Sequence, residues 1–292
     1  MMSLGIVLLL LLSPLSFAVN SISIRFYQTK IPPVRGGILA FQGAFCLFAA
    51  LLYATGIRSL PSVWTVLSGI SFGVCFFVTL VCSARCYEIG PMSLTAVLVN
   101  ASLVLPLIWS VLFFQEQVTV KMVAGIRCVG ATFVLSSFGA RENRKRSNAK
   151  WFLLVTIAFV CNGATAILQK TRQQAEPEGD LFVFPCIAYF TAAVLLFLAF
   201  YLKKDRGPFL PLQRRPLFVL FILTAGAGTF LGNCLLQMLC TEIPAGILYP
   251  TVNGGLCVIT AMASFVIFRE KPTVLKMLSI LSGVAGIVIL NL

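Results

Sequence analysis

The sequence contains no histidine and only 9 acidic residues, against 22 lysines and arginines, in a chain of 292 residues. Without histidine, the chain lacks the commonest metal ligand and the commonest general base of enzymes. Charged residues make up 11% of the chain, whereas a soluble domain carries about 25%. Because so few charges would not cover a water-exposed surface, the composition predicts a protein whose outer face contacts lipid.

Cysteine pairs are missing as well, since none of the 10 cysteines forms a Cys-x-x-Cys motif. Most of them lie in apolar stretches, so we expect small packed side chains rather than disulfides, and we expect no metal and no cofactor. The net charge of +13 is concentrated in short connections between apolar runs. This pattern indicates membrane topology and anionic headgroups, not nucleic acid. The expected partners are the lipid bilayer and a small-molecule substrate.

Ten apolar stretches of about 20 residues follow one another, and each is long enough to cross about 30 Å of hydrocarbon as a helix. We therefore predict an all-α integral membrane protein with ten transmembrane helices. The first stretch resembles a signal peptide but lacks a positive start, so we interpret it as a retained helix. The predicted helices cover residues 2–24, 36–56, 62–85, 92–114, 118–138, 151–171, 181–202, 216–240, 245–268 and 273–291.

The two halves of the chain repeat each other. Cys86 and Glu88 match Cys240 and Glu242, and the same offset of 154 residues takes Glu116 to Glu270. Polar matches at a constant offset indicate an internal repeat. We predict one five-helix repeat at residues 1–140, a basic linker at 141–150 and a second five-helix repeat at 151–292. Because five is odd, the second repeat enters the membrane from the opposite side, which is the inverted arrangement of many transporters.

Lysine and arginine lie mostly in the connections after the first, third, fifth, seventh and ninth predicted helices. Such connections face the cytoplasm. We therefore predict a multi-pass protein of the plasma membrane with both termini on the non-cytoplasmic side. Arg127 is a charge near the middle of a predicted span, and we interpret it as a residue that extends toward the interface rather than a site residue.

Candidate site residues are polar or aromatic groups within the predicted spans. Polar groups in hydrocarbon gather at cavities or helix contacts, because unpaired ones cost free energy. Asn20 and Asn162 occupy matching positions of the two halves, and their amides both donate and accept hydrogen bonds. The alternative for these two is hydrogen bonding between helices. The predicted substrate-binding residues are Asn20, Asn100, Trp109, Asn162, Asn233, Gln237, Tyr249 and Asn253.

The spans at 92–114 and 245–268 are predicted to be broken helices, because they contain Pro106 and Pro250 beside polar residues. Interrupted helices in corresponding positions of two inverted halves indicate a binding site at the membrane midplane. A simple proline kink is the alternative. Trp109 offers a ring face to a substrate or packs in the protein interior.

Both halves end in a similar pattern. The first has Phe114-Gln-Glu116 followed by Val-Thr-Val-Lys-Met, and the second has Phe268-Arg-Glu270 followed by Lys-Pro-Thr-Val-Leu-Lys-Met. This pattern resembles the EamA-type domain, and two such domains in tandem resemble the ten-helix members of the drug/metabolite transporter superfamily. The resemblance implies a secondary transporter that exports a small polar or amphipathic metabolite, such as an amino acid or a drug, by alternating access around a midplane cavity.

Two features depart from the resemblance. Related small multidrug exporters use a glutamate in the first helix, and the span at 2–24 contains no acid. Ten-helix relatives are usually described with both termini in the cytoplasm, opposite to the charge bias here. A sugar or nucleotide-sugar carrier, a lipid-linked sugar flippase and a non-transporting scaffold or receptor remain alternatives. An enzyme is not expected, because the sequence offers no histidine and no paired acids within the spans.

Overall fold

The computed structural model describes residues 4–30, 37–89, 95, 98–138, 149–203, 216–267 and 274–291, and these residues form helices and turns without a strand. The first half of the chain contains α1 (Leu4–Lys30), α2 (Gly37–Ala54), α3 (Val63–Ile89), the 3-10 turn η1 (Ala101–Leu103), α5 (Val104–Phe113) and α6 (Val120–Phe138). The second half contains α7 (Ala149–Ala175), α8 (Val183–Leu202), α10 (Pro216–Leu239), α11 (Ala245–Val266) and α12 (Val274–Asn291).

The apolar runs of the sequence form helices close to the predicted bounds. By length and composition, six of the helices in the described residues suffice to cross a membrane, namely α1, α2, α3, α7, α8 and α10. Shorter apolar helices occupy Leu98–Phe113 and Ala245–Thr260. Membrane crossing by the other predicted spans stays a prediction. The predicted basic linker lies outside the described residues over 141–148.

One of the two predicted helix interruptions is present. The helix that contains Asn100 passes through η1 before α5 begins at Val104. The prediction for the second half is wrong, because α11 runs without a break through Pro250. Proline removes a single backbone donor and its fixed φ is compatible with a helix, so this helix continues through the residue.

Several helix pairings are preserved when the two halves of the chain are exchanged. The contacts of α1 with α10 correspond to those of α7 with α3, and the contacts of α2 with α10 correspond to those of α8 with α3. α2 packs on α8, and α6 packs on α12, so these helices contact their own counterparts. Gly43 lies near Phe197 and Tyr53 lies near Phe182, which makes α2 and α8 antiparallel. Counterpart helices thus run in opposite directions.

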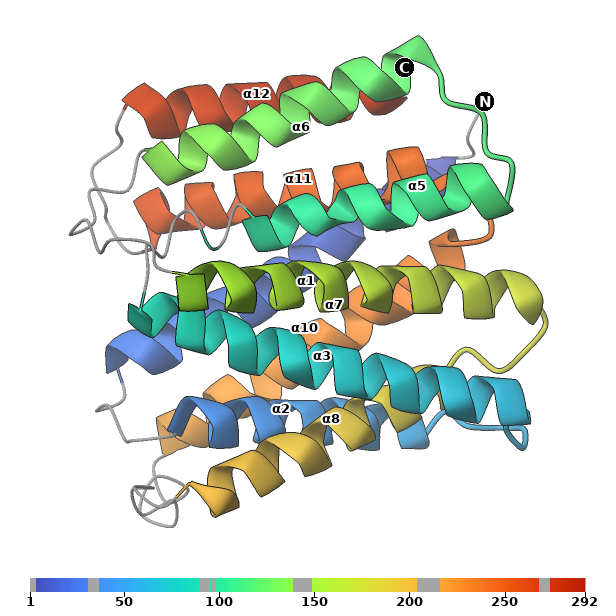
Figure 1. Cartoon of the computed structure of the whole chain (residues 1–292), viewed down its shortest axis with the longest axis vertical. Helices are drawn as coiled ribbons and strands as arrows, with labels where there is room; N and C mark the ends of the chain where they lie inside the picture. Colours follow the sequence, from blue (N-terminus) through green and yellow to red (C-terminus); the bar gives the residue numbers. More distant parts are fainter. Residues whose placement is uncertain are drawn as a thin grey trace.

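Figure 1 shows α6 and α12 at one end of the long axis and α2 and α8 at the other, with the remaining helices between them. α1 begins and α12 ends at the same end of the bundle (Figure 1). The largest buried cluster contains many aromatic side chains from α2, α3, α8 and α10. It fixes these four helices around a space that α1, α7 and α11 line from the other side.

Glycines allow the closest helix contacts. A Cβ atom on Gly228 of α10 would lie 2.6 Å from the carbonyl oxygen of Ser16 in α1. A Cβ atom on Gly73 of α3 would lie 2.5 Å from the carbonyl oxygen of Ala188 in α8. Both distances are too short for any other residue, so these glycines set how closely the helices approach.

Candidate substrate cavity

A cavity of about 920 Å³ lies between the two halves of the chain. Its lining residues come from α1, α2, α3, α7, α8, α10 and α11 and from the interrupted helix around η1. A cavity of this size is at the upper end of those that hold small organic ligands. Six of the eight predicted binding residues line it: Asn20, Asn100, Asn162, Asn233, Tyr249 and Asn253.

Asn20 and Asn162 cross-link neighbouring helices at the cavity wall. The Nδ2 atom of Asn20 donates to the Ala225 carbonyl oxygen at 3.2 Å and to Thr229 Oγ1 at 2.9 Å, both in α10. The Nδ2 atom of Asn162 donates to the Val99 carbonyl oxygen at 3.3 Å and to Ser102 Oγ at 2.7 Å. Each asparagine therefore uses both amide protons within the protein, and its amide oxygen accepts no hydrogen bond from another described residue.

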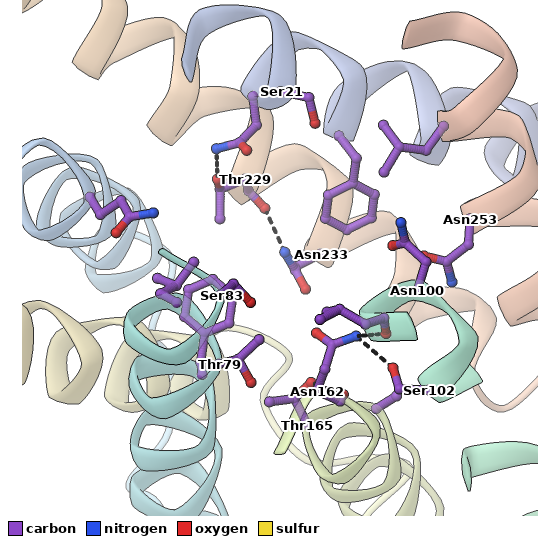
Figure 2. A pocket seen from close by; sticks show the side chains of 18 of the residues that line it. Ser21, Thr79, Ser83, Asn100, Ser102, Asn162, Thr165, Thr229, Asn233 and Asn253 are labelled. Carbon is purple, nitrogen blue, oxygen red and sulfur yellow. Dashed lines mark hydrogen bonds between the residues drawn. The ribbon is translucent and has the colours of Figure 1, made fainter. Parts of the chain in front are cut away.

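Asn233 and Asn253 bond to their own helices. Asn233 Nδ2 donates to the Thr229 carbonyl oxygen at 3.0 Å, and Asn253 Nδ2 donates to the Tyr249 carbonyl oxygen at 2.9 Å. The Tyr249 hydroxyl donates to the Ala166 carbonyl oxygen at 2.9 Å and so joins α11 to α7. Figure 2 shows Asn100, Asn162, Asn233 and Asn253 around one open space.

Trp109 and Gln237, which the sequence also suggested, do not line the cavity. The Trp109 ring stacks on Phe113 within α5, with ring centroids 4.0 Å apart. Gln237 lies one helical turn beyond Asn233 and is buried, and neither amide atom has a hydrogen-bond partner. Helical spacing of four residues put Asn233 and Gln237 on one face, but only Asn233 reaches the open space.

Several lining residues were not anticipated from the sequence. They are polar groups that the sequence analysis did not single out, among them Gln28, Gln42, Thr79, Ser83 and Gln169. Gln42 is 7% exposed, and its Oε1 atom has no hydrogen-bond partner. A glutamine in the middle of an apolar run costs free energy in hydrocarbon. This cost would have identified Gln42 as a candidate cavity residue from the sequence.

The cavity reaches only one end of the bundle. Tyr27, Gln28, Ala84 and Lys203 line it, and they lie at the C-terminal ends of α1, α3 and α8. Trp151 at the start of α7 contacts this end, because the Cys86 thiol of α3 donates to its carbonyl oxygen. The described cations of this end include Arg25, Lys30, Arg85, Lys150 and Lys203, so the mouth of the cavity lies on the basic side.

A buried ion pair closes the opposite end. Lys170, 1% exposed in α7, pairs through Nζ with Oε1 of Glu116, which follows α5. The second carboxylate oxygen of Glu116 accepts the backbone N–H of Ala245 at 2.8 Å, where α11 begins. A carboxylate at a helix N-terminus is stabilised by the helix dipole. Glu116 therefore caps a helix of the other half, α11.

A second polar cluster joins the loop before α3 to the loop after α7 at the same closed end. The buried guanidinium of Arg172 donates to Thr65 Oγ1 at 3.2 Å and to the Asp180 carbonyl oxygen at 2.8 Å. Glu176 accepts hydrogen bonds from Ser62 Oγ at 2.6 Å and from Thr65 Oγ1 at 2.7 Å. These hydroxyl groups, followed by nearby Arg172, hold the pKa of the Glu176 carboxyl below its ordinary value.

Asp180 fixes the same loops through backbone donors. Burial raises the pKa of its carboxyl, but the N–H groups of Arg58, Phe182 and Ser59 outweigh this effect, and the net pKa is below its usual range. The N–H of Arg58 lies 2.7 Å from Asp180 Oδ2. Both carboxylates therefore hold the closed end together in their ionised form.

Neither disulfides nor an evident metal site contributes to this arrangement. All ten cysteines are free thiols. Across the part of the chain that the structure describes, no group of three His, Cys, Asp or Glu side chains gathers as metal ligands. The chemistry of the cavity therefore comes from amides, hydroxyls and aromatic rings.

The fold and the cavity define a multi-pass integral membrane protein built from two similar helical units. A family model named EamA-like transporter family matches residues 4–138 and 149–292. The chain therefore belongs to the EamA-like transporter family, which is a family of transporters and not of enzymes. The match falls once on each half of the chain, which is the two-repeat architecture of this family.

A solved crystal structure has the same fold. It aligns over 98% of this chain and 96% of its own, with a TM-score of 0.76 and 14% sequence identity. At this identity the likeness extends to the fold alone. No curated protein matches the chain.

Proposed function

We propose that the protein is a secondary transporter that moves a small polar or amphipathic solute by alternating access. The observation that carries this proposal is a cavity between two oppositely directed halves that reaches the basic end and is closed at the other end by Lys170 and Glu116. Inverted repeats exchange conformations around a central site, so the opposite end opens when the first one closes. The state described here is the one open toward the basic side.

The basic side faces the cytoplasm of a plasma-membrane protein in this proposal, and both termini lie on the opposite side. The described cations at the cavity mouth and the carboxylates Glu176 and Asp180 at the closed end support this orientation, because positive loops stay in the cytoplasm. The proposed direction is export, since the open cavity then loads from the cytoplasm. A reporter fused to Leu292 that is active only outside the cytoplasm tests the orientation, and a cytoplasmic signal would contradict it.

Flux into proteoliposomes tests transport itself. Purified protein is reconstituted, and the uptake of labelled amino acids, amines and sugars is compared with empty vesicles. Ser21→Trp places an indole in the cavity, and Leu11→Trp on the same helix places one on an exposed position. We expect Ser21→Trp to abolish flux and Leu11→Trp to retain it. Absence of flux for every solute, or equal flux in Ser21→Trp and the wild type, would overturn the proposal.

A further inference from the structure

The orientation of four amide groups in the cavity determines which atoms a solute meets. The Nδ2 atoms of Asn20, Asn162, Asn233 and Asn253 each donate to a backbone carbonyl oxygen. A carbonyl oxygen only accepts, so turning any of these amides around would place two oxygens against each other. The nitrogen is therefore fixed against the wall, and the amide oxygen is the atom left for the solute.

Four hydroxyl groups of the lining have donated their proton within the protein. Thr79, Thr165 and Thr229 donate to the carbonyl oxygens of Cys75, Asn162 and Ala225 at 2.9 Å, 2.6 Å and 2.9 Å. The Tyr249 hydroxyl donates to Ala166. A hydroxyl that has donated its proton offers only lone pairs to a ligand. These four groups add acceptors to the middle of the cavity, while the Ser83 hydroxyl, which also lines it, has no hydrogen-bond partner.

Four further amides line the cavity, those of Gln28, Gln42, Asn100 and Gln169, and two of them have no fixed orientation. Gln42 is buried with an unpartnered oxygen, and Asn100 has no hydrogen bond among the described residues. An unsatisfied buried polar group costs free energy until a ligand or water pairs with it. These two side chains are therefore available to adapt to a solute that the four fixed asparagines hold.

Aromatic rings form the rest of the wall beside the amides. Phe72, Phe76 and Tyr189 line the cavity and contact one another, with ring centroids 5.6 to 6.0 Å apart. Ring faces attract N–H groups that carry positive charge and also pack against apolar bodies. Among the described residues that line the cavity there is no Asp or Glu, so their attraction for a donor comes from amide dipoles and rings.

Resting on the transport function proposed above, we infer that the cavity binds a small organic ligand with N–H donors and an apolar body. The cluster of Asn20, Asn162, Asn233 and Asn253 excludes carboxylate and phosphate groups. The N–H group is an ammonium or a neutral amide, and it donates to the oxygens of Asn20, Asn162, Asn233 and Asn253. Anionic ligands need donors, and the fixed asparagines present acceptors. Lys203 lies at the mouth, away from this cluster in the middle of the helices.

Three probes with the same phenyl body and different end groups test the inference by thermal shift in detergent. They are 2-phenylethylamine, 3-phenylpropanamide and 3-phenylpropionate. A ligand that binds the folded state raises the unfolding midpoint by mass action, on the order of 2–4 °C for a chain of this size near saturation. We expect the amine or the amide to raise the midpoint and the carboxylate to leave it unchanged. The amine and amide arms distinguish a charged from a neutral donor.

Matched variants on α10 connect the shift to the cavity. Asn233→Leu removes a lining amide whose hydrogen bond lies within its own helix, so the fold loses no partner. Gln237→Leu removes a buried amide four residues away that does not line the cavity. We expect Asn233→Leu to weaken binding of the N–H probe about tenfold and Gln237→Leu to leave it unchanged. Asn253→Leu on α11 repeats the first change on a different helix.

Three outcomes would overturn the inference. The first is that the carboxylate raises the unfolding midpoint as much as or more than the amine and the amide, and the second is that neither N–H probe raises it. The third is that Asn233→Leu and Asn253→Leu both leave binding of the N–H probe unchanged. These outcomes are separate from a failure of transport. An N–H probe that binds through Asn233 but shows no flux in proteoliposomes would refute the transporter and leave the binding chemistry in place. Flux of an anionic solute would leave the transporter in place and refute the binding chemistry.

Discussion

The ammonium group of Lys170 and the carboxylate of Glu116 form a buried ion pair that joins the second half of the chain to the first. The pair lies beyond Tyr249, at the end of the bundle opposite the cavity mouth, and Glu116 also accepts the N–H of Ala245. One carboxylate thus holds both α7 and the start of α11. Opening this end requires that the Lys170 contact, the Ala245 contact or both be broken.

We expect Lys170→Met to destabilise the folded protein by about 3–5 kcal/mol, because it leaves the Glu116 carboxylate partly buried without its cation. The double variant Lys170→Met/Glu116→Gln is expected to recover much of this loss, since no charge is left unpaired. A double-mutant cycle of unfolding midpoints measures the coupling between the two residues. Additive effects of the two single changes would show that the pair contributes no mutual stabilisation.

The Glu176 carboxylate gives the closed end a pH dependence. Its pKa in the folded protein is lowered by Ser62 and Thr65, while an unfolded glutamate titrates at about 4.3. A lowered folded pKa means that the stabilisation is present above the unfolded value and is lost as the pH falls through the folded value. We therefore expect the unfolding midpoint to fall with acidification below about pH 4.3, which a thermal scan series measures.

Two glutamine variants in the same loop test this assignment. Glu176→Gln should reduce the loss of stability on acidification, while Asp180 retains its own contribution. Glu178→Gln is the matched control, because Glu178 is exposed two residues away and has no hydrogen bond in the structure. Identical acid profiles for Glu176→Gln and the wild type would contradict the proposed role of Glu176.

Helix bounds follow from the sequence to within a few residues for most elements, because a lipid-exposed helix must be apolar over its whole length. The largest extension is at α1, which runs to Lys30, beyond the predicted 24, and α3 and α7 extend to Ile89 and Ala175, beyond the predicted 85 and 171. Polar and charged residues end an apolar run but do not end a helix. The position of Asn20 and Asn162 on the cavity wall also follows from the repeat, since matching residues face a shared pseudo-symmetric space.

The closed end was less accessible to sequence reasoning. Lys170 and Arg172 lie at and just after the end of the predicted span 151–171, where a charged side chain is expected to face water, whereas both are buried in α7. Their partners, Glu116 and Thr65, are 54 and 107 residues away, so no local pattern could pair them. The prediction that Trp109 lines the cavity is wrong for a different reason. A helix has several faces, and composition alone does not tell which face borders the cavity.

Gly228 tests how closely α1 and α10 must approach. A Cβ atom there would meet the Ser16 carbonyl oxygen at 2.6 Å and the Asn20 nitrogen at 2.9 Å. Both are backbone atoms of a packed helix, so the helices must separate. We expect Gly228→Ala to destabilise the protein by about 1–3 kcal/mol and to weaken solute binding, because Asn20 shifts with α1. Gly130→Ala is the control, since a Cβ atom there contacts nothing within 4 Å, and an equal loss in both variants would contradict the close-contact explanation.

For Gln237 we predict a stabilising substitution, because removal of its polar group should increase the stability of the protein. The side chain is 1% exposed, and neither its nitrogen nor its oxygen has a hydrogen-bond partner. A buried unsatisfied group costs about 1–3 kcal/mol, whereas an apolar side chain of similar size does not. We therefore expect Gln237→Leu to raise the unfolding midpoint. Thr229→Val on the same helix is the contrasting change, because Thr229 accepts from Asn20 and donates to Ala225, and it should lower the midpoint. A lower midpoint for Gln237→Leu would mean that the amide is satisfied in the folded protein, by water or by another conformation of the bundle.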